Sequence, residues 1–94
     1  MSWSVSAVGR PAKVKEVLAT QFANAKQSTQ HIPAEQASVE QVEALFNNLL
    51  DFSVENELGV VSVSASGSAS KKSGTYNGSV STTVSFAPIY GFVE

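Results

Sequence analysis

The sequence predicts an α+β fold, a two-layer sandwich with the element order β-α-α-β-β. Three stretches alternate apolar residues with serine or threonine, which is the period-two pattern of half-buried strands. Two other stretches repeat apolar residues at helical spacing. Because two amphipathic helices need an apolar surface to cover, we expect both on one face of a three-stranded, mostly antiparallel sheet. The 94 residues suit a single domain over 1–94.

A strand over residues 2–8 is the first element, with Trp3 on its apolar face and serines on the other. Gly9 ends this strand. Pro11 follows at a position where the first turn of a helix accepts a residue without an N–H group. We expect this helix over about 11–27. Its apolar stripe consists of Val14, Val17, Leu18, Phe22 and Ala25.

The next segment, KQSTQHIPAEQAS, is polar and is interrupted by Pro33, so we expect a connection with room for one short turn. Ser38 and Gln41 have the S-x-x-Q spacing of a capping box, which predicts that the second helix begins there. The apolar residues behind this cap form the strongest amphipathic pattern in the chain. We expect them to be the spine of the core: Val39, Val42, Leu45, Phe46, Leu49 and Leu50.

The last two strands are predicted to form a hairpin whose other edge receives the first strand. A tip at Ser73-Gly74 places Val63 opposite Val84. Asn77-Gly78 is a stronger turn dipeptide by type, but a tip there would pair Lys71 with Val84. We therefore prefer the first tip and expect a mobile loop through Lys71 and Lys72.

The serine and threonine side chains of the strands fall on the sheet face that the helices do not cover. Antiparallel sheets often have one solvated face, so one interpretation is a plain solvent-facing surface. Such surfaces usually carry charged side chains against unwanted pairing, whereas these strands carry almost none. The other interpretation is a protein contact, because small uncharged side chains lose little entropy on docking. The candidates on this face are Ser62, Ser64, Ser81, Thr83 and Ser85.

The ending APIYGFVE is densely apolar and must pack against something. It either extends the last strand over the core of its own chain or forms an arm that docks into a neighbouring subunit. Tyr90 and Phe92 are therefore further candidates for a protein interface, and self-association into a homo-oligomer is one expected outcome.

No catalytic, cofactor-binding or metal site is predicted, so we expect a protein that is not an enzyme and needs no cofactor. His31 is the single histidine and has no partners at metal-ligand spacing. No serine has the G-x-S-x-G context, and GSASKKSG lacks the order of a phosphate-binding loop. Two acidic groups are also set aside. Glu35, Glu40 and Glu43 could suggest paired carboxylates, but Glu40 and Glu43 lie one turn apart on the polar face of a helix, which favours a solvated helix face. Asp51, Glu55 and Glu57 follow the second helix without the pattern of a calcium loop.

The charge balance argues against a nucleic-acid partner. Six basic and eight acidic residues give a net charge of −2, without the basic stripe that such a partner requires. No stretch approaches the roughly 20 apolar residues of a membrane span, so we expect no membrane partner. The chain has no cysteine and hence no disulfide.

The opening MSWSVSAVGRPAKV, the helix after it and the ending PIYGFVE resemble small proteins encoded in tailed-bacteriophage genomes. The resemblance implies a structural component of the virion or of its assembly, for instance a capsid decoration protein. It places the chain in the virion, or in the host cytoplasm before assembly, with phage structural proteins or further copies as partners. The alternative is a small phage-encoded regulatory module that binds a host protein.

Overall fold

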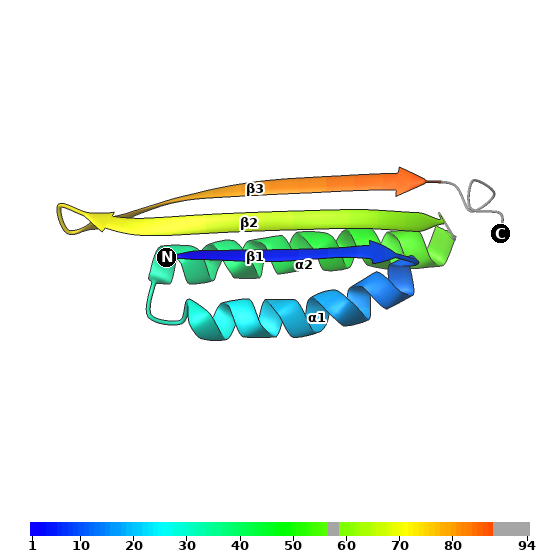
Figure 1. The fold of residues 1–94 in the computed structure, drawn as a ribbon, viewed down its shortest axis with the longest axis horizontal. Coiled ribbons are helices and arrows are strands. Elements are labelled where there is room, and N and C mark those ends of the chain that lie inside the picture. Colours follow the sequence, from blue (N-terminus) through cyan, green and yellow to red (C-terminus); the bar gives the residue numbers. More distant parts are fainter. Residues whose placement is uncertain (57–58, 88–94) are drawn as a thin grey trace.

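The computed structural model, which describes residues 1–56 and 59–87, confirms the predicted α+β architecture. A three-stranded antiparallel sheet of order β1-β2-β3 has α2 behind it and α1 along the β1 side, and the molecule measures 54 × 20 × 18 Å (Figure 1). The elements are β1 (Ser2–Gly9), α1 (Pro11–Ser28), α2 (Pro33–Asn56), β2 (Val60–Lys72) and β3 (Thr75–Ala87).

The hairpin of β2 and β3 has the predicted register, with Val63 opposite Val84. Ser73 and Gly74 form its two-residue tip, with φ of 53° and 80°. Two successive left-handed residues are typical of a type I′ turn, whose twist matches that of the flanking strands. The expected mobile loop is wrong, because Lys71 and Lys72 continue β2 up to this turn.

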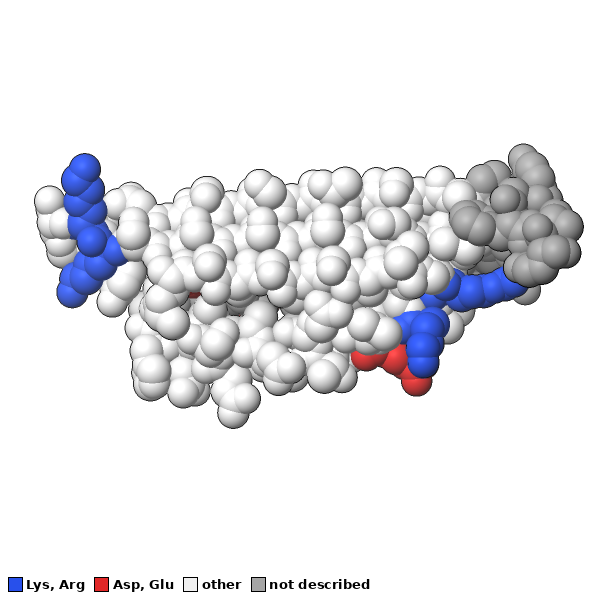
Figure 2. All heavy atoms as spheres, viewed as in Figure 1, with Lys and Arg blue, Asp and Glu red and all other residues white. Residues whose placement is uncertain are grey.

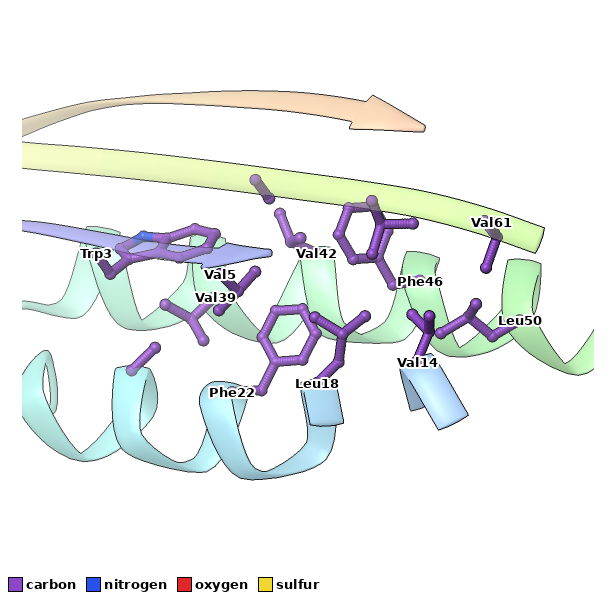
Figure 3. Close-up of a cluster of buried hydrophobic side chains, with 13 residues drawn as sticks. Trp3, Val5, Val14, Leu18, Phe22, Val39, Val42, Phe46, Leu50 and Val61 are labelled. Carbon is purple, nitrogen blue, oxygen red and sulfur yellow. The ribbon is translucent and has the colours of Figure 1, made fainter. Parts of the chain in front are cut away.

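The hydrophobic core lies between the helices and the strands β1 and β2 (Figure 3). Phe22 of α1 and Phe46 of α2 meet at its centre, with ring centroids 6.0 Å apart and planes tilted by 59°. Trp3 is buried beneath β1 as predicted. The stripe of α1 is confirmed for its buried members Val14, Leu18, Phe22 and Ala25, whereas Val17 lies at the surface.

The second helix begins at Pro33, five residues before the predicted capping box. Pro33 occupies the first turn of α2 as Pro11 occupies that of α1, because this position needs no N–H donor. Ser38 is therefore inside the helix, where its hydroxyl donates to the carbonyl of Ala34. The connection shrinks to four residues and is anchored by buried Thr29, whose hydroxyl donates to the carbonyl of Ala25.

One of the two acidic groups lies elsewhere than predicted, and a member of the other is paired with α1. Asp51 and Glu55 belong to α2 itself rather than to a segment after it, and Glu57 lies outside the described residues. Asp51 pairs with Lys15 of α1. Glu43 is only partly exposed and accepts from Lys26 of α1 at 2.7 Å. Glu43 and Asp51 therefore lie on the side of α2 that faces α1.

The helices leave part of the sheet uncovered, which the sequence did not indicate. α1 packs mainly against β1 and α2 packs beneath β2 and β3, yet Val80 and Phe86 on the helix side of β3 remain 42% and 47% exposed. Leu45 of α2, expected in the core, is 48% exposed. Two helices do not span the width of three strands, so the apolar face of β3 lacks a full cover.

Candidate protein-interaction surface

The sheet face opposite the helices is a grid of exposed hydroxyl groups, which we call the hydroxyl face. Each residue there has neighbours directly opposite on the adjacent strands, so the register aligns serine and threonine in rows across the sheet. Three rows carry a hydroxyl at every position. They are Ser2–Ser68–Ser79, Ser4–Ser66–Ser81 and Ser6–Ser64–Thr83, and the next row is Val8–Ser62–Ser85.

The five strand candidates named from the sequence all lie on this face and are exposed, so the structure brings them together. Ser62 and Ser64 stand on the central strand beside Ser85 and Thr83, and Ser81 belongs to the next row. Their positions follow from strict alternation, because successive side chains of a strand point to opposite faces. Tyr90 and Phe92, the two candidates of the C-terminal segment, lie outside the described residues.

The rows of the hydroxyl face carry no charged side chain. Figure 2 shows a continuous surface without charged side chains over the strands, from the hairpin tip with Lys71 and Lys72 toward the other end of the sheet. Where β1 begins, beside the middle of β2 and β3, this face has a shallow depression framed by serines of all three strands, among them Ser4, Ser66 and Ser81. Ser68 and Ser79 approach each other there, with hydroxyl oxygens 3.4 Å apart.

This arrangement can donate and accept hydrogen bonds, but none of its rows contains an ionisable side chain. A serine hydroxyl becomes a nucleophile only beside a base that takes its proton. His31 lies in the turn between α1 and α2, in the helix layer, where Nε2 lies 3.3 Å from the amide nitrogen of Gln30. Within residues 1–56 and 59–87, no three acidic, histidine or cysteine residues form a group suited to a metal ion.

One ionisable residue stands out in a different place. Glu35 in the first turn of α2 is 1% exposed, and neither of its carboxylate oxygens has a hydrogen-bond partner. Burial raises the pKa of this carboxyl, and the nearby Met1 ammonium opposes that rise. Sequence reasoning missed its burial because the helix was expected to begin at Ser38. From Pro33 onward, Glu35 shares the buried stripe of Val39 and Val42.

Comparisons with protein-family models, curated proteins and solved structures found no match to the chain. In the part of the chain that the structure describes, neither helix is apolar enough over a sufficient length to cross a membrane.

Proposed function

We propose that the chain is a non-enzymatic interaction protein that docks on another protein through its hydroxyl face. The observation that carries this proposal is the set of aligned hydroxyl rows over three strands, exposed and without a charge. A surface made only for solvent gains from lysine and glutamate, which keep sheets from associating. A surface made for contact gains from short side chains, because they lose little conformational entropy.

The strands also make this surface rigid. β2 is hydrogen bonded on both sides, and its inward residues Val61, Val63 and Ala65 are fixed in the core. A rigid surface loses little freedom on binding, which favours association even when each contact is weak. Hydroxyl groups can donate or accept, so each serine can satisfy either kind of partner group.

The resemblance to small proteins of tailed bacteriophages supports a virion component as the specific form of this function. Such a component would dock repeatedly on a regular protein surface, and repetition of weak contacts would supply the adhesion. Such a component would reside in the virion, or in the host cytoplasm before assembly. The partner would be a phage structural protein, for instance that of the capsid.

Quantitative mass spectrometry of purified particles of the encoding phage tests this proposal. We expect the wild-type chain in the particles, and we expect the double variant Ser64→Glu/Ser81→Glu to be lost from them, since it places two charges on the hydroxyl face. The matched control is Asn48→Glu, which adds a charge on the exposed outer side of α2. Circular dichroism checks that all three are folded.

Two outcomes would overturn the proposal. Absence of the wild-type chain from particles, with recovery of the chain bound to a host protein, would support the regulatory alternative instead. Equal incorporation of the Ser64→Glu/Ser81→Glu variant and the wild type would show that the hydroxyl face is not the docking surface.

A further inference from the structure

The two edges of the sheet differ in whether another element hydrogen bonds to their backbone. At the β1 edge, the side-chain amide of Gln21 from α1 pairs with the backbone of Ser6 as a neighbouring strand would. Its Oε1 accepts from the Ser6 N–H at 2.9 Å, and its Nε2 donates to the Ser6 carbonyl at 2.7 Å. Among the described residues, no hydrogen bond from another element reaches the outer edge of β3. β3 has thirteen residues, and its unpaired backbone N–H and C=O groups can hydrogen bond to a further strand.

The pairing pattern identifies the backbone groups at this open edge. Met1 and Ala69 exchange both backbone hydrogen bonds, so the odd-numbered residues of β2 bond toward β1 and the even-numbered ones toward β3. Ser68 therefore bonds with Ser79, and the even-numbered residues of β3 direct their N–H and C=O groups outward. These residues are Tyr76, Gly78, Val80, Thr82, Val84 and Phe86.

Apolar side chains lie directly beneath this edge. Leu45, Leu49 and Phe52 follow one another at helical spacing on the side of α2 away from its ion pairs with α1. Phe52 is 57% exposed. Together with the helix side of β3 they form a surface that we call the open flank, and its members are Leu45, Leu49, Phe52, Val80, Val84 and Phe86.

We propose that the occupant of this edge is a second copy of the chain, paired antiparallel β3 to β3 across a twofold axis. The combined sheet has six strands in the order β1-β2-β3-β3-β2-β1. β3 contains no charged residue, so two copies meet at the seam without like-charge repulsion. Charged side chains usually keep an exposed edge strand from associating with other chains. In the dimer, pairing with the second copy covers the β3 edge instead.

The helix layer supports a second copy rather than an unrelated strand. α2 packs beneath both β2 and β3, so two strand spacings separate its axis from that of its mate across the seam. At about 4.8 Å per spacing, the two axes lie about 10 Å apart, which is the distance at which helices pack. Each open flank would then be covered by the open flank of the partner. A partner that brought only a strand would leave Leu45 and Phe52 exposed.

Light scattering coupled to size-exclusion chromatography tests this pairing on the full chain. We expect the wild type at twice the 9.9 kDa of one chain. Thr82→Lys places a charge in the seam and should return the mass to that of one chain. This change leaves the backbone ladder with β2 unaltered, because it replaces only an exposed side chain. The matched control is Ser4→Lys on β1, which should remain dimeric.

A cross-linking experiment gives a second readout that does not depend on disrupting the protein. The chain has no cysteine, so Thr82→Cys introduces a single thiol. We expect a short bis-maleimide to join two Thr82→Cys chains efficiently. Ser4→Cys should stay unjoined, since five strand spacings of about 4.8 Å separate the two β1 strands of the dimer.

A wild-type chain that is monomeric at every concentration would overturn the pairing, as would a folded Thr82→Lys variant that stays dimeric. Equal cross-linking of Thr82→Cys and Ser4→Cys would also overturn it. The pairing concerns the edge and the open flank and does not rest on the hydroxyl face. If the β3 pairing is disproved, the proposed docking through the hydroxyl face still stands or falls with the Ser64→Glu/Ser81→Glu variant.

Discussion

Trp3 and Gly67 lie opposite each other on β1 and β2, and the indole ring fills the space that any side chain at position 67 would need. A Cβ atom built on Gly67 falls 2.4 Å from Nε1 and 2.7 Å from Cε2 of Trp3. Both residues are buried, and the indole N–H has no hydrogen-bond partner. The glycine thus lets a large ring pack flat against the sheet at the end of the core.

This contact predicts that Gly67→Ala destabilises the protein, although alanine suits a strand better than glycine does. The added methyl group has to displace a buried ring, and overpacking of that kind costs about 1–3 kcal/mol. Urea unfolding followed by circular dichroism measures the free energy of unfolding. If Gly67→Ala lowers the free energy of unfolding by less than an ordinary surface substitution does, the prediction is contradicted.

A double-mutant cycle separates the ring contact from any backbone effect. In the Trp3→Leu background the space above Gly67 is larger, so Gly67→Ala should cost less than it does in the wild type. An equal cost in both backgrounds would assign the effect to the backbone of β2 rather than to Trp3.

Much of this fold could be predicted from the sequence because its strands alternate so regularly. Alternation fixes which face each residue takes. The hairpin register followed from the residue types that each tip would pair, since a tip at Asn77-Gly78 keeps the same faces but would have placed Lys71 opposite Val84. The beginning of α2 could not be predicted in the same way. Pro33 marks either a break or a first turn, and the choice depends on Thr29 and the tertiary packing around it.

The candidate surface could be predicted only in part. The hydroxyl face follows from alternation alone, and its strand residues lie where the pattern placed them. The exposure of Leu45 could not be predicted, because the apolar stripe of α2 is wider than the part that meets the core. Which strands two helices cover depends on their lateral position, and no residue pattern in β3 encodes that position.

The buried carboxyl of Glu35 predicts a specific pH dependence of stability. Its pKa is raised above the ordinary value of 4.5, chiefly by burial, so the folded chain keeps this proton to higher pH than the unfolded chain does. Its contribution is fully present below pH 4.5 and is lost as the pH rises through the raised pKa. Glu35→Gln removes this titration, so the variant should gain stability relative to the wild type between acidic and neutral pH.

Urea unfolding of both proteins at a series of pH values measures this difference directly. Subtracting the wild-type profile from that of Glu35→Gln cancels the other carboxyl groups. A matched control is Glu40→Gln, because Glu40 is exposed on the same helix and should leave the profile parallel to that of the wild type. Parallel profiles for Glu35→Gln as well would show that burial does not perturb this carboxyl.

The tip of the hairpin predicts a substitution that stabilises the protein locally. Ser73 has φ of 53°, a conformation that asparagine adopts more readily than serine, and Gly74 already follows it. Ser73→Asn should therefore slow hydrogen exchange of the Lys72 and Thr75 amides by a few-fold. Ser73→Val should speed it, since a β-branched side chain strains this conformation. Slower exchange in both variants would contradict a left-handed turn.

Gln21 predicts what happens when the protected edge of the sheet is opened. Gln21→Ala removes both hydrogen bonds to the Ser6 backbone, and because this site is exposed to water the loss of stability should be small, about 0.5–1 kcal/mol. Its effect on assembly should be larger. With β3 paired as we propose, an open β1 gives each dimer two free edges, which permits growth into longer assemblies. Light scattering should then detect species larger than the dimer for Gln21→Ala. The double variant Gln21→Ala/Thr82→Lys should form only dimers that are joined through β1, because its β3 edge no longer pairs. A variant that remains strictly dimeric would mean that the Gln21 amide does not guard this edge.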